Sequence, residues 1–159
     1  MSTLKWTAAL AVGDDEIDQQ HQHLLRRVNA LLAAIDRGVD PKDLKTMVDF
    51  LEDYAVLHFS LEEFRMREAK YDDLAQHRTH HEAFIGDLLD FKDRLARASG
   101  NAALADELAE HLVNWVKRHV MGSDREMGAF LAKHNAAKKP GKRSAKAPAR
   151  KRALRRRTR

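Results

Sequence analysis

The chain has 159 residues, no cysteine and a net charge of +5. This length suits one domain with a core of its own, and the lack of cysteine excludes disulfides, zinc–thiolate sites and cysteine-ligated iron–sulfur clusters. Charge is unevenly distributed: residues 138–159 hold twelve Lys or Arg and no acidic residue, which leaves 17 basic against 24 acidic residues before them. We predict an acidic domain over residues 1–133, with a net charge of −7 before residue 138, and a disordered basic tail over 134–159.

The hydropathy pattern argues against membrane insertion and secretion. No segment approaches the roughly 18 consecutive apolar residues of a membrane-spanning helix. The short apolar stretch near the N-terminus is interrupted by Trp6 and Thr7, so it does not resemble a secretory signal. Together with the absence of cysteine, this pattern predicts a cytoplasmic protein, which we expect to be monomeric.

Two helices are predicted in the first half of the chain. The first carries apolar residues at helical spacing up to Ile35, with His21 extending the same face, and ends at Gly38. Asp40 and Pro41 then supply an N-cap and a first-turn proline. The second helix follows, with its apolar stripe continuing to Met66.

Two further helices are predicted in the second half. The third carries an aligned stripe from Leu74 to Leu95, and the fourth presents a stripe from Leu104 to His119; the helix-breaking residues Ser99-Gly100-Asn101 separate them. Strand patterns are missing and the connections are short. We therefore predict an all-α protein with an antiparallel, up-down-up-down four-helix bundle.

This topology brings seven potential metal ligands to one height in the bundle. His21 and His58 lie 18 and 19 residues from the first turn, and His81 and His119 each lie 19 residues from Gly100. Across the turn between the second and third helices, the ligand pairs differ in height by only about 4–5 Å, at a rise of about 1.5 Å per residue. The predicted metal ligands are His21, His58, Glu62, His77, His81, His119 and Asp124.

Five imidazoles and two carboxylates exceed the six positions around one metal ion. We expect two iron ions, bridged by Glu62, Asp124 and a solvent oxide or hydroxide. His77, His81 and His119 would then complete six-coordination of one iron. His21 and His58 would leave the other iron with one open position.

The spacing within the fourth helix needs a local adjustment. His119 and Asp124 are five residues apart, so an ideal α-helix does not align them, and we expect a distortion near Gly122 and Ser123. The other four histidines lack ligand-type neighbours and are predicted at the surface, namely His23, His80, His111 and His134. Tyr54, Phe84 and Trp115 are predicted to be packing residues or pocket walls.

Four motifs carry a family resemblance: VGDDEIDQQH at 12–21, HFSLEEFRM at 58–66 preceded by Tyr54, QHRTHHEAF at 76–84, and WVKRHVMGSDREMGAFL at 115–131. On these motifs the chain resembles the hemerythrins, in particular their bacterial single-domain type, from Trp6 to about Lys133. The resemblance implies that the seven residues are the diiron ligands, with Glu62 and Asp124 as bridges. It also implies reversible dioxygen binding rather than enzymatic activity.

Two alternatives stay open. A diiron enzyme with peroxidase, oxidase or nitric-oxide-handling activity could use the same ligands. However, the Glu-x-x-His pattern of ferritin-like diiron enzymes is missing. The basic residues of 138–159 could instead attach an oxygen-sensing domain to nucleic acid or another anionic surface, without sequence specificity because the tail has no aromatic residue.

Overall fold

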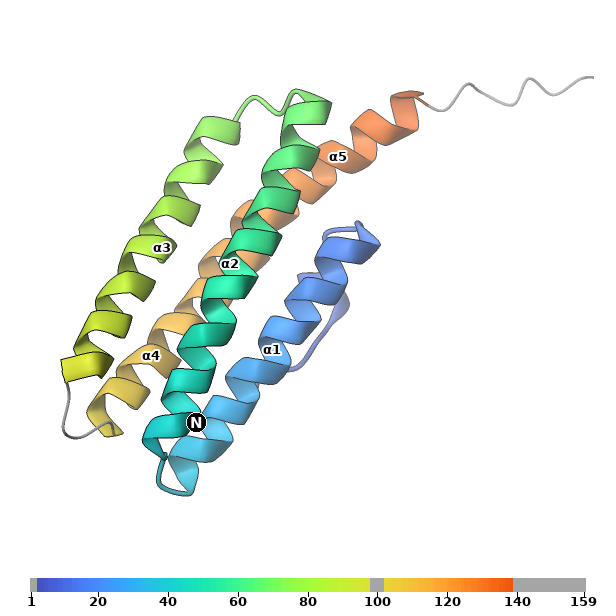
Figure 1. Ribbon diagram of the computed structural model, residues 1–159. Helices are drawn as coiled ribbons and strands as arrows, with labels where there is room; N and C mark the ends of the chain where they lie inside the picture. Colours follow the sequence, from blue (N-terminus) through green and yellow to red (C-terminus); the bar gives the residue numbers. More distant parts are fainter. Residues whose placement is uncertain (1–2, 98–101, 139–159) are drawn as a thin grey trace, which may run out of the picture.

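A computed structural model describes residues 3–97 and 102–138 and shows a bundle of antiparallel helices (Figure 1). This part of the chain contains no strand, so the predicted all-α four-helix bundle is confirmed. The elements are η1 (Ala8–Leu10), α1 (Asp15–Asp36), α2 (Pro41–Ala69), α3 (Leu74–Arg97), α4 (Ala102–Trp115), the π-helical η2 (Val116–Ser123) and α5 (Asp124–Lys138).

Helix ends form where the sequence supplies capping groups. The Asp14 side chain accepts hydrogen bonds from the backbone N–H groups of Glu16 and Ile17, which begins α1. Asp40 and Asp43 form a reciprocal capping box at the start of α2. At its end, Lys70 adopts a left-handed conformation with φ of 56°. The caps fix the register of the helices that carry the candidate ligands.

The helical stretch that carries the last two candidate ligands extends beyond the predicted domain boundary. α4, η2 and α5 form one continuous helical stretch, and α5 ends at Lys138, beyond the boundary expected at residue 133. The rest of the predicted basic tail, residues 139–159, lies outside the described residues. None of the described helices combines the length and hydropathy that crossing a bilayer requires.

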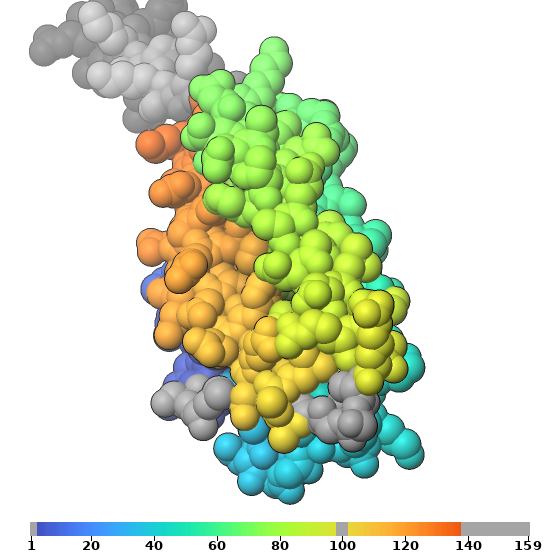
Figure 2. Space-filling view, turned by 90° about the vertical axis from the view of Figure 1, so that its left-hand side faces the viewer, coloured from blue at the N-terminus to red at the C-terminus, as the bar shows by residue number. Residues whose placement is uncertain are grey.

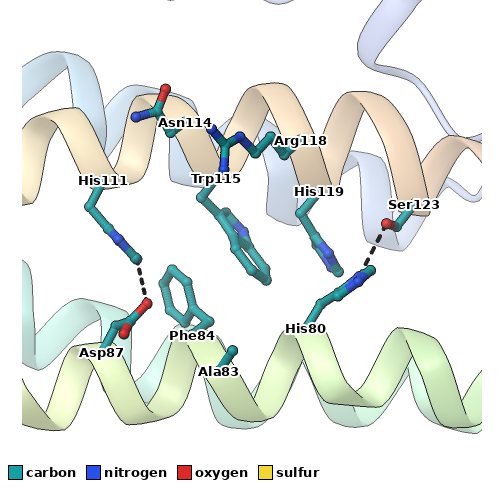
Figure 3. Close-up of a pocket in the computed structure, with 10 residues that line it drawn as sticks. All are labelled: His80, Ala83, Phe84, Asp87, His111, Asn114, Trp115, Arg118, His119 and Ser123. Atoms are coloured by element: carbon teal, nitrogen blue, oxygen red, sulfur yellow. Dashed lines mark hydrogen bonds and ion pairs between the residues drawn. The ribbon is translucent and has the colours of Figure 1, made fainter.

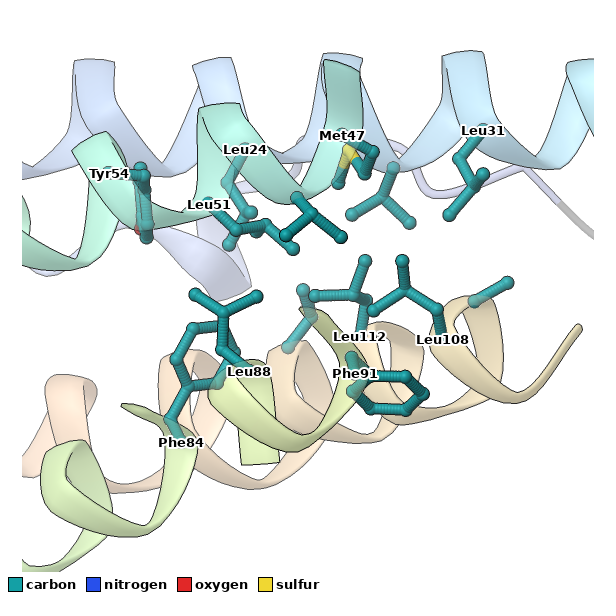
Figure 4. Close-up of a cluster of buried hydrophobic side chains, with 14 of the residues drawn as sticks. Leu24, Leu31, Met47, Leu51, Tyr54, Phe84, Leu88, Phe91, Leu108 and Leu112 are labelled. Atoms are coloured by element: carbon teal, nitrogen blue, oxygen red, sulfur yellow. The ribbon is translucent and has the colours of Figure 1, made fainter. Parts of the chain in front are cut away.

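Two apolar clusters lie above and below the candidate site. The larger cluster joins all four helices of the bundle and includes Leu24, Leu51, Phe84 and Leu112 (Figure 4). A smaller cluster contains Val12, Ile17, Met66, Ala69, Met127 and Leu131. On α2 the larger cluster ends at Phe59 and the buried residues of the smaller cluster begin at Met66, so Glu62 lies between two apolar layers.

The chain before α1 packs closely against α5. A Cβ atom at Gly128 would lie 2.3 Å from the Val12 carbonyl oxygen and 2.8 Å from the Val12 Cβ. Such contacts are too short for any side chain larger than hydrogen. Glycine at this position therefore lets the N-terminal segment cover the helix that follows Asp124.

We predict that Gly128→Ala lowers the free energy of unfolding by about 1–3 kcal/mol because the new methyl group must displace backbone. Gly86→Ala is the matched control, since no atom lies within 4 Å of a Cβ at this helical position. It should stabilise the protein by about 0.5–1 kcal/mol. Urea denaturation of both variants checks the pair, and a Gly128→Ala variant as stable as the wild type would contradict the close approach.

Candidate metal centre

A π-helical segment aligns the last two candidate ligands. The backbone N–H of Asp124 donates a hydrogen bond to the carbonyl of His119, five residues earlier. This widened turn places both side chains on one face, and the His119 Nε2 lies 3.0 Å from the Asp124 Oδ1. The expected distortion between His119 and Asp124 is therefore confirmed, and it extends over Val116–Ser123.

The structure brings all seven predicted site residues into one buried cluster. α1 supplies one histidine, α2 a histidine and a glutamate, α3 two histidines, and η2 with α5 the remaining pair. None is more than 3% exposed. They are the only buried polar or charged residues in the described ranges 3–97 and 102–138: His21, His58, Glu62, His77, His81, His119 and Asp124.

The cluster divides into two overlapping groups of potential ligand atoms. One group combines Glu62 with His77, His81 and His119, and within each group the atoms lie within 4.8 Å of one another. The other consists of His21, His58, Glu62 and Asp124. Glu62 is thus shared by two groups that contain three and two histidines.

Both carboxylates face both groups. The Glu62 Oε2 lies 3.1 Å from the His81 Nε2, and its Oε1 lies 3.4 Å from the His58 Nε2. On the other side, the Asp124 oxygens lie 3.0 Å from the His119 Nε2 and 3.1 Å from the His21 Nε2. Each carboxylate could therefore contact two cations at once.

The donor set fits metal ions better than it fits an internal hydrogen-bond network. The Nε2 atoms of His21 and His58 are 3.2 Å apart, and those of His81 and His119 are 3.1 Å apart. Ligand nitrogens about 2.1 Å from one ion and at right angles are about 3.0 Å apart. Moreover, Glu62 Oε1 and both Asp124 oxygens are buried without a hydrogen-bond partner among the described residues. Imidazole and carboxylate donors suit iron.

Burial sets the protonation of the cluster. It lowers the pKa of His58, His77 and His119, which favours the neutral imidazole that binds metal ions. Burial and the nearby Asp124 raise the pKa of Glu62 to about 7. Burial also opposes ionisation of Asp124, but contacts with His119 and His21 outweigh it and hold the pKa of that carboxyl below its ordinary value. A cation between the carboxylates would allow both to ionise.

Two residues that the sequence did not single out orient the candidate ligands. The His58 Nδ1 donates to Gln20 Oε1 at 2.8 Å, and the His81 Nδ1 donates to Glu63 Oε1 at 3.2 Å. These bonds fix the proton on Nδ1 and leave Nε2 free for a metal ion. The only sequence signal was adjacency, since Gln20 precedes His21 and Glu63 follows a predicted ligand.

Aromatic rings hold three of the imidazoles in place. Phe59 stacks on His81 with ring centroids 3.9 Å apart. In the same way Trp115 stacks on His119 at 4.0 Å, and Tyr54 stacks on His58 at 4.6 Å. These rings restrict the imidazole orientations and keep water from the cluster, which agrees with the packing role predicted for Tyr54 and Trp115.

The remaining histidines differ partly from the sequence prediction. His23 is exposed as predicted, whereas His80, His111 and His134 are half-buried. His80 and His111 line a groove between α3 and α4–η2 (Figure 3). The prediction of plain surface positions was wrong for this pair because their neighbours on the facing helix are far away in the sequence.

Comparison with known proteins agrees with this geometry. The hemerythrin HHE cation-binding domain matches residues 12–131, so the chain belongs to the hemerythrin family. It is 32% identical over 134 residues to a bacteriohemerythrin of Stenotrophomonas maltophilia, covering 84% of this chain and 85% of that relative. A bacteriohemerythrin of Methylococcus capsulatus is 27% identical over 133 residues, covering 83% and 99%. The crystal structure of wild-type hemerythrin superposes with a TM-score of 0.67 at 28% identity, covering 82% of this chain and 99% of that one.

We predict that metal affinity falls as the pH drops below about 7. Metal binding must displace the proton that Glu62 holds at low pH, because its pKa is raised to about 7. This proton alone lowers the apparent association constant by up to about tenfold per pH unit. Competition with a chelator of known pH dependence measures the effect. An affinity independent of pH across this range would show that Glu62 is not protonated in the metal-free site.

Proposed function

We propose that the seven clustered residues hold two iron ions and that the protein binds dioxygen reversibly. The observation that carries this proposal is the pair of overlapping ligand groups that share Glu62. One group has three histidines and the other two. In hemerythrins such a diiron centre binds dioxygen reversibly and supplies electrons to it.

The unequal division of histidines supports a site for dioxygen. If Glu62, Asp124 and one solvent-derived oxygen bridge the ions, three histidines fill the remaining positions on one side. Only His21 and His58 remain for the other side, which keeps one position open. We assign dioxygen binding to the side of His21 and His58.

The residues around the candidate ligands favour reversible dioxygen binding over enzymatic turnover. Gln20 and Glu63 accept hydrogen bonds from the Nδ1 atoms of two candidate ligands, so these imidazoles stay oriented with Nε2 free for a metal ion. The stacked rings of Tyr54, Phe59 and Trp115 restrict the entry of water. A site that restricts the entry of water disfavours the release of reduced oxygen species and hence enzymatic oxidation.

The experiment that tests this function is a spectroscopic oxygen cycle. Iron-loaded protein is reduced without oxygen, exposed to dioxygen and then returned to vacuum. The proposal predicts an absorption band that appears with dioxygen and disappears with its removal. Rapid formation of ferric protein with consumption of added reductant would instead support a diiron peroxidase, oxidase or nitric-oxide-handling enzyme.

Glu62→Ala should abolish the paired centre, because Glu62 is the residue common to both ligand groups. We predict that bound iron falls from two ions per chain to one or none and that the oxygen-dependent band is lost. His23→Ala is the matched control, since His23 is exposed on the same helix as His21. It should keep both ions. Iron analysis with absorption spectra distinguishes the two variants, and a Glu62→Ala variant with two ions would refute the shared role.

We further propose that residues 138–159 attach the domain to nucleic acid. Their twelve basic residues and lack of acidic residues favour binding to phosphate groups that weakens as salt is added. The domain before them is acidic, so the tail is the part of the chain with a strong positive charge. Anionic membrane surfaces would attract the same residues.

Removing residues 139–159 should abolish a low-salt electrophoretic mobility shift with duplex DNA. The full chain should shift DNA of unrelated sequences equally, and the shift should weaken about 10³-fold or more between about 50 and 200 mM salt if six or more phosphates are contacted. A full chain that shifts no DNA at low salt would remove nucleic acid as the partner. Vesicle sedimentation with anionic lipid would then test membranes.

A further inference from the structure

Tyr54 carries a buried hydroxyl group that the folded chain leaves without a hydrogen bond. The residue is 5% exposed, and its hydroxyl oxygen has no hydrogen-bond partner among residues 3–97 and 102–138. The ring points from α2 into the bundle, among apolar side chains of the larger cluster that offer no acceptor (Figure 4). Burying a hydroxyl without a partner is costly, so this group points to an acceptor that the chain itself does not supply.

The Tyr54 hydroxyl lies within electrostatic reach of the metal cluster. Its ring stacks on that of His58, one helical turn away, with ring centroids 4.6 Å apart. Burial and, to a lesser extent, the charges of Glu62 and Asp124 raise the pKa of the Tyr54 hydroxyl well above its ordinary value. The phenol therefore keeps its proton and can donate it in a hydrogen bond.

The position of Tyr54 favours the side of the cluster with two histidines. His58 shares this side with His21, where the division of the ligands leaves one coordination position open. Trp115 Nε1 is also buried without a partner, but Trp115 stacks on His119, which belongs to the group with three histidines. Tyr54 thus places an unpartnered donor on the side of the open position.

The acceptor that fits this hydroxyl is a molecule held by the metal ions. Tyr54 does not line the groove between α3 and α4–η2, the hollow in the space-filling view (Figure 2), so a ligand bound there does not reach it. A molecule held by the metal ions lies as deep as Tyr54, because no candidate ligand is more than 3% exposed. Dioxygen gains negative charge when the diiron centre supplies electrons to it, and hydrogen bonds to charged acceptors are about twice as strong as neutral ones.

We propose that Tyr54 donates a hydrogen bond to dioxygen at the two-histidine side of the centre and thereby slows its release. This role rests on the proposed diiron function. Because the hydroxyl shares its proton without giving it up, it stabilises the charge on dioxygen and does not promote loss of a reduced oxygen species. Tyr54 would be a binding residue in addition to its packing against His58.

Tyr54→Phe tests this role, because phenylalanine keeps the ring that stacks on His58 and removes only the hydroxyl. Oxygenated protein is mixed with excess dithionite, which consumes released dioxygen, and the decay of the oxygen-dependent absorption band is followed. Release should be at least about tenfold faster from Tyr54→Phe than from the wild type. Tyr71→Phe is the matched control, since Tyr71 packs against Phe130 beside the smaller cluster, and the same change there should leave the rate unaltered.

Urea denaturation of the iron-free variants gives a readout that does not depend on dioxygen. Tyr54→Phe should unfold at the same urea concentration as the wild type or a higher one, because the hydroxyl has no hydrogen bond to lose. A lower midpoint would show that the hydroxyl is bonded within the chain and would overturn the proposal.

The release experiment separates the role of Tyr54 from the proposed function. A wild type that shows the oxygen-dependent band and releases dioxygen no more slowly than Tyr54→Phe would overturn the role of Tyr54 alone. A wild type without this band would contradict the proposed function, and the role of Tyr54 with it. The absorption bands of oxidised protein without dioxygen should be the same in Tyr54→Phe and the wild type. A shift of these bands would place the hydroxyl at the solvent-derived bridge or on a metal ion, which would also overturn the proposal.

Discussion

Two carboxylates, Glu62 and Asp124, lie inside a dry helical bundle, and the arrangement of the site depends on balancing their charge. An ionised carboxylate in such surroundings is costly unless a cation compensates it. No lysine or arginine is buried anywhere in the part of the chain that the structure describes. The available compensation comes from five imidazoles and from metal ions, and burial lowers the pKa of three of the imidazoles, those of His58, His77 and His119. Because neutral histidines carry no positive charge, metal ions compensate the two carboxylates better than the imidazoles do.

The fold meets this requirement by bringing one layer of ligands together from every helix of the bundle. Apolar clusters on both sides of that layer exclude water, and stacked aromatic rings restrict the imidazoles. The π-helical turn of η2 adds one residue between His119 and Asp124 and so points both inward. It also widens the helix that forms one wall of the groove, where His119 is both a candidate ligand and a lining residue. The metal site and the groove therefore share one local distortion.

The sequence was sufficient for the helices and for the height of the seven candidate ligands, because both follow from the regular rise and period of α-helices. The five-residue spacing of His119 and Asp124 also predicted a distortion, although not its full extent. The roles of Gln20 and Glu63 could not be predicted, since their hydrogen bonds depend on how adjacent helices rotate about their axes. The groove at His80 likewise arises from the separation of two helices, which periodicity does not determine.

The most direct test of the account is a crystal structure of iron-loaded protein with anomalous diffraction at the iron absorption edge. The account predicts two anomalous peaks, one among His77, His81 and His119 and one beside His21 and His58. Glu62 and Asp124 should lie between the peaks. A single peak, or two peaks that share neither carboxylate, would contradict the proposed diiron centre.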